Sequence, residues 1–281
     1  MKIITTVREM QAEARRIRSA GRIIGFVPTM GFLHAGHLSL IRTAREKADI
    51  IVLSIYVNPT QFGPDEDLSR YPRDFDRDEE MARRAGVDIL FYPSDSEIYP
   101  PGHRTFVEVE DITRRLCGAS RPAHFRGVTT IVAKLFHAVQ PHVAVFGQKD
   151  AQQAIVIRRM AKDLNFDVEI AVAPIVREPD GLAMSSRNTY LSPDERRDAL
   201  ALYESLRLAE ERIRSGERNA GVIIESVAAH IRSKTHNRID YVACVDAETL
   251  DPLETVSGRV LIALAVSTGR TRLIDNIILD V

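Results

Sequence analysis

The sequence predicts an α/β protein: a doubly wound parallel sheet followed by a smaller C-terminal α+β domain. Short apolar runs of strand length alternate with helical patterns, which is typical of a parallel sheet with helices on both faces. The run Ile50–Val57 is almost continuously apolar and rich in β-branched residues, as in a strand that is covered on both faces. After Val176, two helical patterns precede three strand-like runs. We therefore expect a first domain over residues 1–176 and a second over residues 177–281.

The elements of the expected first domain begin with a helix. Thr6 and Glu9 match a capping box, and the amphipathic pattern that follows ends at Gly21. Later breaks between elements fall at glycine, proline or polar clusters. The expected strands are 23–27, 50–57, 87–92, 143–146 and 168–172, and the further helices are one that begins after Gly36, then 74–85, 127–139 and 150–164.

The expected second domain begins with a polar, turn-rich loop, R-E-P-D-G-L-A-M-S-S-R-N. Ser192 and Glu195 form another capping box with Pro193 at the first helical position, and this helix is predicted to run to Gly216. The remaining expected elements are a helix over 222–232 and strands over 239–245, 260–266 and 273–279.

Composition and charge exclude several classes of function. The chain has 281 residues, 44% of them apolar, and 38 basic against 39 acidic residues give a net charge of −1. This balance argues against a nucleic-acid partner, because such binding depends on many phosphate contacts. Cys117 and Cys244 are the only cysteines, which favours a reducing cytoplasm over a disulfide framework. No apolar run approaches the length of a membrane span, so we expect a cytoplasmic protein without a membrane partner.

Two histidines lie where the first long strand meets a helix. Residues 23–41 predict a strand, a tight loop and a helix, with His34 in the loop and His37 in the first helical turn. In an open parallel sheet, ligands bind at the carboxyl ends of the strands, and helix starts offer free N–H groups to phosphate. The alternative is that both imidazoles only pack or cap the helix. Their spacing could also seat a metal, but no third His or Cys ligand lies nearby in the sequence.

The string V-P-T-M-G-F-L-H-A-G-H, residues 27–37, carries a family resemblance. It resembles the HxGH signature of the nucleotidyltransferase superfamily and, within it, the pantothenate synthetase (pantoate–β-alanine ligase) family. The resemblance implies a Rossmann-like fold and an AMP-forming carbon–nitrogen ligase that condenses (R)-pantoate with β-alanine through a pantoyl adenylate, which supplies a coenzyme A precursor. It also implies ATP as a substrate, Mg²⁺ held through the ATP phosphates rather than by the protein, and a homodimer.

Further strings extend the resemblance along the chain. Residues 146–150 are similar to the family's F-G-E-K-D, and residues 184–188 to its S-S-R-N element, the counterpart of a lid over ATP. Residues 121–127 resemble the run R-P-x-H-F-R-G, in which Arg121 could contact a substrate carboxylate or be a solvated loop residue. The chain departs from the pattern twice, with Cys117 and Gln148 where the family usually has glutamate. If the missing glutamate at 117 supports Arg121, this chain must do so differently.

The resemblance assigns roles residue by residue. Catalytic roles are implied for His34, His37, Lys149, Ser185, Ser186 and Arg187. ATP binding is implied for Met30, Gly31, Phe32, Leu33, His34, Ala35, Gly36, His37, Gly147, Gln148, Lys149, Asp150, Val176, Met184, Ser185, Ser186 and Arg187. Pantoate and β-alanine binding is implied for Gln61, Gln153 and Asn58. The acidic run 74–80 is interpreted as solvated surface.

Two other functions remain open from the sequence. A different nucleotidyltransferase of the same superfamily would transfer the nucleotide to a phosphate and leave it there. An RNA-binding module derived from a synthetase would consume no ATP and would bind with an affinity that falls steeply with salt. The near-neutral charge disfavours the second alternative.

Overall fold

A computed structural model describes residues 1–64 and 66–281. The chain forms two compact units. The first comprises residues Met1–Thr113, Arg121–Gly147 and Gln153–Pro174, and the second comprises Arg114–Ser120, Gln148–Gln152 and Ile175–Val281.

The first unit contains a parallel sheet of six strands, as the alternating pattern predicted. The strand order is β1-β4-β3-β2-β5-β6, and every pair is parallel. The strands are β1 Lys2–Ile4, β2 Ile24–Thr29, β3 Ile50–Ile55, β4 Ile89–Phe91, β5 Val143–Gly147 and β6 Glu169–Ala173. Strand β1 was not predicted, because three residues are too few to show a periodicity.

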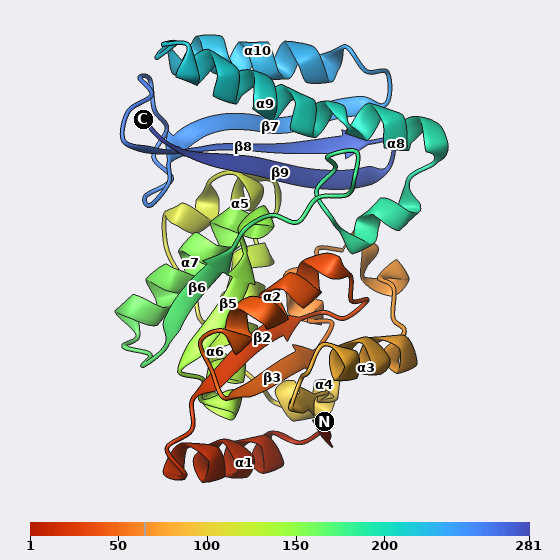
Figure 1. Ribbon diagram of the computed structural model, residues 1–281, viewed down its shortest axis with the longest axis vertical. Coiled ribbons are helices and arrows are strands. Elements are labelled where there is room, and N and C mark those ends of the chain that lie inside the picture. Colours follow the sequence, from red (N-terminus) through yellow and green to blue (C-terminus); the bar gives the residue numbers. More distant parts are fainter. Residues whose placement is uncertain (65) are drawn as a thin grey trace. The chain divides into compact units, whose positions relative to one another are not determined.

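Helices cover both faces of this sheet (Figure 1). On one face, the apolar core joins the strands to Ile41 and Ala44 of α2 and to Ala82 of α3. On the other face, Phe26 of β2 packs edge-to-face on Phe136 of α6, with ring centroids 6.5 Å apart. The α-helices of this unit are α1 Val7–Ser19, α2 Ala35–Arg45, α3 Phe75–Arg84, α4 Asp95–Ile98, α6 His124–Val139 and, from Gln153 on, α7 Ala151–Asp163. Short 3₁₀ turns are η1 Pro59–Gln61, η2 Asp67–Arg70 and η3 Ile112–Arg114.

The strand order creates a switch point at β2. Strand β2 pairs with β3 on one side and with β5 on the other. The chain therefore builds the sheet outward from β2 in one direction and later returns to extend it in the other. The carboxyl ends of strands at such a reversal are the usual ligand site of open α/β sheets. Residues 30–34, which we call the histidine loop, follow β2 directly and lead into α2.

The second unit is an antiparallel sheet of three strands with helices on one face (Figure 1). Its core joins α9 and α10 to the strands through residues such as Leu206, Ile223 and Ile262. Its elements are α5 Cys117–Ser120, η4 Gln148–Asp150, η5 Ser186–Tyr190, α8 Pro193–Ala199, α9 Ala201–Arg214, α10 Ala220–Arg232, β7 Asn237–Asp246, β8 Arg259–Thr268 and β9 Thr271–Asp280. The strands are longer than predicted because their polar ends still pair across the sheet.

Two helix predictions were wrong in detail. The helix expected from Ser192 to Gly216 is broken at Leu200, whose N–H bonds the carbonyl of Arg197 three residues back instead of continuing the α-helical pattern. The helix expected from Gly127 begins at His124, because polar residues that resemble a loop in the sequence already adopt its first turn.

Candidate active site

The histidine loop owes its shape to two residues in the left-handed region. Gly31 has φ +80° and Phe32 has φ +50°. The Thr29 hydroxyl donates to the Ser54 carbonyl at 2.7 Å and accepts the Gly31 N–H at 3.2 Å, which ties the loop to β3. Glycine is required at position 31 both by its φ and by space, because a Cβ there would lie 2.9 Å from Ile55.

A buried carboxylate holds this loop from α3. The N–H groups of Phe32 and Leu33 donate to Oδ2 and Oδ1 of Asp78 at 2.6 and 2.7 Å. Asp78 is only 1% exposed, so the interpretation of the acidic run as solvated surface is wrong for this residue. Burial raises the pKa of Asp78, and the hydrogen bonds from Leu33 and Phe32 act against that rise. The cause of the error is the helix, which turns this one acidic side chain toward the core face that Ala82 shares.

His34 and His37 form a capping box at the start of α2. Nδ1 of His34 accepts the N–H of Gly36 at 3.1 Å, and Nδ1 of His37 accepts the N–H of His34 at 3.3 Å. The two ring centroids are 4.1 Å apart. The sequence left open whether the two imidazoles cap the helix, and the structure shows that both do. Because each Nδ1 is an acceptor, the proton of each neutral ring lies on Nε2, which makes Nε2–H a donor.

Gln61 is oriented by a buried asparagine. The Asn58 amide donates to Gln61 Oε1 at 2.9 Å and to the Gly127 carbonyl at 3.1 Å. Asn58 Oδ1 accepts the hydroxyl groups of Thr60 and Tyr99, both at 2.9 Å, and the side chain is 1% exposed. Both donors of Asn58 are thus used within the protein. The structure therefore shows Asn58 joining Gln61 to the main chain of α6.

Gln61 also contacts the histidine loop. Its Nε2 lies 3.3 Å from the sulfur of Met30. Two stretches that the sequence assigned to different substrates, the nucleotide loop and the pantoate glutamine, are therefore adjacent at one edge of the sheet.

Arg121 is supported by Glu66. The guanidinium forms two hydrogen bonds with this carboxylate, at 2.7 and 2.5 Å, and its Nη2 also lies 3.3 Å from the Gln61 carbonyl. His124 Nδ1 lies 2.9 Å from the same carbonyl. Burial is the largest single effect and raises the pKa of Glu66, but Arg121, the Gly63 N–H and His124 together outweigh it, so the net pKa is lowered. Arg121 is therefore paired and is not a solvated loop residue. With cysteine at position 117, its carboxylate partner in this chain is Glu66.

In the second unit, Asn276 of β9 holds the turn that carries Lys149. Its amide donates to the carbonyls of Gln148 and Lys149 at 2.9 and 3.0 Å, and it is 3% exposed. Gln148 Nε2 donates back to Asn276 Oδ1 at 3.3 Å. The usual family glutamate could not donate to that oxygen, so the glutamine suits its neighbour here. Lys149 Nζ lies 3.6 Å from Asp150.

The loop of residues 184–188, which carries Ser185, Ser186 and Arg187, follows a hairpin that is fixed by a buried ion pair. Arg177 and Asp275 form two hydrogen bonds of 2.6 and 3.0 Å, and Asp275 is 2% exposed. Met184 N–H bonds the Val176 carbonyl at 3.0 Å, which closes the hairpin. Burial raises the pKa of Asp275, and Arg177 opposes the rise.

The loop itself begins a 3₁₀ turn. Ser185 caps that turn by accepting the Arg187 N–H at 3.3 Å, and Ser186 is buried. The hairpin therefore presents hydroxyl and guanidinium groups in consecutive positions.

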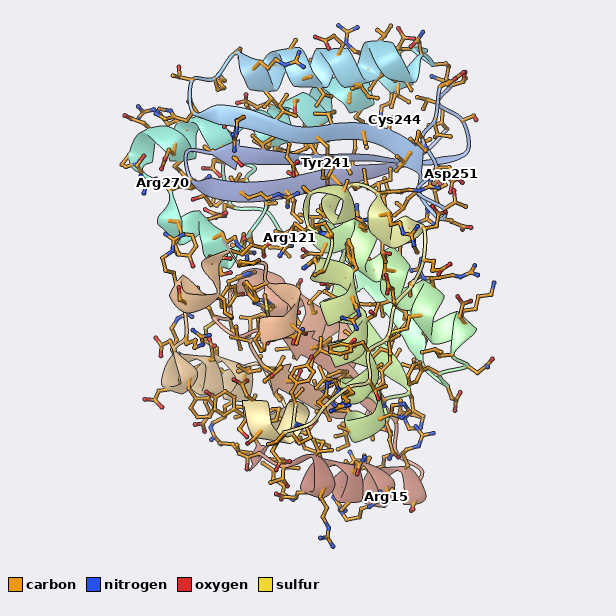
Figure 2. The ribbon with its side chains drawn as sticks, turned by 180° about the vertical axis from the view of Figure 1, so that it is seen from behind. Arg15, Arg121, Tyr241, Cys244, Asp251 and Arg270 are labelled. Carbon is orange, nitrogen blue, oxygen red and sulfur yellow. The ribbon has the colours of Figure 1, made fainter. Side chains whose placement is uncertain are left out.

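Cys117 lies in a polar cluster of the second unit, beside β7 and β9. Its sulfur is 3.2 Å from the Tyr241 hydroxyl and 3.6 Å from a guanidinium nitrogen of Arg272. Arg272 pairs with Asp240 at 2.6 Å, so a carboxylate from β7 neutralises it. Figure 2 labels Tyr241 and Cys244 on the same strand. Gln152 accepts the Cys117 N–H at 3.0 Å.

The structure distributes the sequence-predicted residues over both units. The first unit holds the stretch from Met30 to His37, with Ala35 and Gly36 in the first turn of α2, together with Asn58, Gln61, Gly147 and Gln153. Gln153 lies in α7 and is partly exposed. The second unit holds Gln148, Lys149, Asp150, Val176 and the stretch from Met184 to Arg187.

Residues 1–64 and 66–281 include no group of three or more His, Cys, Asp or Glu side chains that could hold a metal ion. Within the same residues, no helix is both long and apolar enough to span a membrane.

The fold and the histidine loop define a Rossmann-like α/β protein of the HxGH type. The family model for pantoate–β-alanine ligase matches residues 2–278. A pantothenate synthetase from Acetivibrio thermocellus is 57% identical over 281 residues, covering both chains completely, and one from Moorella thermoacetica is 56% identical over 100% of this chain and 99% of its own. The chain belongs to the pantoate–β-alanine ligase family.

Solved structures agree with this assignment. A pantothenate synthetase from Thermus thermophilus superposes with a TM-score of 0.94, at 46% identity over 99% of each chain. A pantoate–β-alanine ligase from Francisella tularensis, complexed with β-γ ATP and β-alanine, has a TM-score of 0.80 at 33% identity, over 99% of this chain and 97% of its own.

Proposed function

We propose that this chain uses ATP to join (R)-pantoate to β-alanine, giving pantothenate, AMP and pyrophosphate through a pantoyl adenylate. The observation that carries the proposal is the pair of adjacent imidazoles of His34 and His37 at the switch point of the sheet. Membership of the family and the ligands named for the Francisella tularensis relative support the same reaction.

The reaction solves a problem of carboxylate chemistry. A carboxylate is a poor acylating agent at neutral pH. Its oxygen attacks the α-phosphorus of ATP, the bond to pyrophosphate breaks, and pyrophosphate leaves with that electron pair. The neutral amine of β-alanine then attacks the acyl carbon, loses a proton, and AMP leaves. Neither step requires a covalent bond to the protein, so alignment and charge stabilisation carry the catalysis.

We assign the charge stabilisation to six donors. His34 and His37 offer Nε2–H groups, which hydrogen-bond the phosphate oxygens as negative charge develops. Lys149, Ser185, Ser186 and Arg187 bind the phosphates of ATP, since ammonium, hydroxyl and guanidinium groups all donate to phosphate oxygen. The rest of the assigned nucleotide contacts come from residues 30–37, 147–150, Val176 and Met184.

Pantoate is assigned to Gln61 and Gln153. The Asn58 amide occupies Oε1 of Gln61, so Gln61 presents its Nε2–H group to an acceptor oxygen of the substrate. Asn58 acts as a positioning residue, because both of its donors are already used in the protein. We also propose that the loop of residues 184–188 closes over bound ATP and shields the adenylate from water.

Mg²⁺ is assigned to the ATP phosphates. Mg²⁺ keeps several waters and is commonly bound through substrate phosphates with few protein ligands. Both cysteines are free and buried, which supports work in the reducing cytoplasm.

A homodimer completes the proposal. Residues 104–109 belong to no helix, strand or turn, and among the described residues their main chain bonds only to threonine side chains, from Val107 and Val109. An extended segment with open amides can pair with its copy in a second chain. Replacing Thr105 by proline, which cannot donate, should shift the mass measured by light scattering from dimer to monomer. An unchanged mass would contradict pairing at this segment.

The test of the reaction is isotope exchange between ATP and pyrophosphate. The wild-type chain should catalyse exchange that depends on pantoate and needs no β-alanine, and it should release AMP steadily only when β-alanine is added. Exchange without pantoate, or a stable nucleotide-linked product, would instead support another nucleotidyltransferase.

A further inference from the structure

Asp78 contributes a buried charge that the proposed chemistry does not use. Its side chain lies in the first turn of α3 and is 1% exposed. A carboxylate in such a place is costly unless its oxygens accept hydrogen bonds. Here each oxygen accepts one main-chain N–H, from Phe32 at 2.6 Å and from Leu33 at 2.7 Å. Arg77 Nη1 lies 3.5 Å from Oδ1.

The loop is shaped to fit this carboxylate. Successive residues in unusual turn conformations can point neighbouring N–H groups toward one anion. Gly31 and Phe32, at φ +80° and +50°, form such a turn. A Cβ on Gly31 would lie 2.9 Å from Asp78 Oδ2, so the carboxylate fills the space against the loop.

The same helix also fixes the peptide group that enters His34. Arg77 Nη2 donates to the Leu33 carbonyl at 2.8 Å, and its guanidinium carbon lies 4.8 Å above the Phe32 ring. The N–H of that peptide group belongs to His34 and donates to His37 Nδ1. An unbroken series of contacts therefore runs from α3 through the loop to both imidazoles.

We infer that Asp78 is a positioning residue for His34 and His37. Its carboxylate holds the loop so that both rings keep Nδ1 on the main chain and direct Nε2–H to the phosphate during adenylate formation. The inference rests on the proposed function and refines it, because the N–H groups of Phe32 and Leu33 are bound to Asp78 and do not bind ATP.

The test compares Asp78→Asn with Asp76→Asn. Both changes remove one negative charge from the first turn of α3, but Asp76 is exposed. An asparagine at position 78 keeps one acceptor and places an NH₂ group against the other N–H. We expect the kcat of pantoate-dependent exchange to fall by at least about tenfold in Asp78→Asn, the scale for one unsatisfied buried group, and to stay within about twofold in the control. The rate at which β-alanine attacks preformed adenylate should stay within about twofold of the wild-type rate in both variants.

NMR of the histidine rings distinguishes positioning from stability alone. If Asp78 only stabilised the fold, the ring tautomers of a folded variant would not change. In the folded wild-type chain, ¹⁵N shifts should show both rings with unprotonated Nδ1 and protonated Nε2. In Asp78→Asn, still folded by circular dichroism, the rings should shift to a mixture of tautomers. Unchanged ring shifts, or exchange equal to that of Asp76→Asn, would overturn the inference.

A second variant covers the case in which Asp78→Asn does not fold. Asp78→Glu keeps the negative charge but displaces the carboxylate by one methylene group from the N–H groups of Phe32 and Leu33. Its exchange rate should fall by at least about twofold with shifted ring resonances, and wild-type values for both would overturn the inference. If the wild-type chain shows no pantoate-dependent exchange, the proposed function fails, whereas the ring spectra still test the role of Asp78.

Discussion

Gly127 of α6 lies against the main chain of Thr60 with no room for a side chain. A Cβ built on Gly127 would stand 2.4 Å from the Thr60 carbonyl oxygen and 2.6 Å from the nitrogen of Gln61. The Gly127 carbonyl also accepts a hydrogen bond from Asn58. The helix and the turn that carries Gln61 are therefore packed backbone to backbone.

Gly127→Ala should destabilise the protein. Alanine in a helix is favoured over glycine by about 1 kcal/mol, but overpacking costs about 1–3 kcal/mol or more, and here the clash is with main chain that cannot rotate away. With overpacking at the upper end of that range, about 3 kcal/mol, less the gain of about 1 kcal/mol in helix propensity, we expect a net loss of about 2 kcal/mol in urea unfolding. The KM for pantoate should also rise, because the turn must move. Gly63→Ala is the control, since the atoms nearest to its Cβ would belong to the Glu66 side chain, at 3.5 Å or more. If Gly127→Ala and Gly63→Ala were equally stable, α6 would be able to move away from the Thr60 main chain without cost, and the predicted clash would be wrong.

His34→Asn separates the capping role of this histidine from its role in catalysis. Asparagine is a preferred N-cap and can accept the Gly36 N–H, but it lacks a distal ring donor. The stability of the variant should stay within about 0.5 kcal/mol of the wild type. Pantoate-dependent exchange should slow by about 10²–10³, the cost of losing one preorganised donor. Near-normal exchange would show that His34 only caps α2.

The fold could be predicted because its signals are local. Alternating apolar runs and helical patterns gave the parallel sheet, and the interval from Val27 to His37 located the histidine loop. Boundaries were less accurate where a polar first turn, as at His124, looks like a loop in the sequence.

The supports of the site could not be predicted because each joins residues that are distant in the sequence. Glu66 meets Arg121 across 55 positions, and Arg177 meets Asp275 across 98. A charged residue gives no sign of which partner it will find. Asp78 had one usable signal, since it lies four residues before Ala82 on the buried face of α3.

Asn276→Ala tests the support of the Lys149 turn. The change leaves the carbonyls of Gln148 and Lys149 without their donor, which should cost about 1–3 kcal/mol in unfolding free energy. Displacement of Lys149 should also weaken ATP binding by up to about tenfold, equivalent to about 1.4 kcal/mol, measured by titration calorimetry. Gln148→Ala removes only the 3.3 Å bond to Asn276 and should cost less than about 1 kcal/mol. If the asparagine variant lost no more stability than the glutamine variant, the turn would be held by other contacts.

Cys244 should remain an unreactive thiol until the second unit unfolds. It is 2% exposed on β7, and burial raises its pKa to about 11. Because the thiolate is the reactive form, only about one molecule in a thousand carries it at pH 8. Iodoacetamide at that pH should leave Cys244 unlabelled in the native chain and label it in urea. Labelling of the native chain at the rate of a free cysteine would contradict the burial.

The same pKa shift predicts a loss of stability at alkaline pH. The folded pKa lies above the unfolded value of about 8.5, so folding favours the protonated thiol. Its contribution to stability is complete below about pH 8.5 and is lost as pH rises toward 11. The difference in unfolding free energy between the wild type and Cys244→Ala should therefore shrink between pH 8 and pH 10.5. Tyrosine and lysine titrate in both chains and cancel in this difference, so a constant difference would mean that the thiol ionises without cost in the folded state.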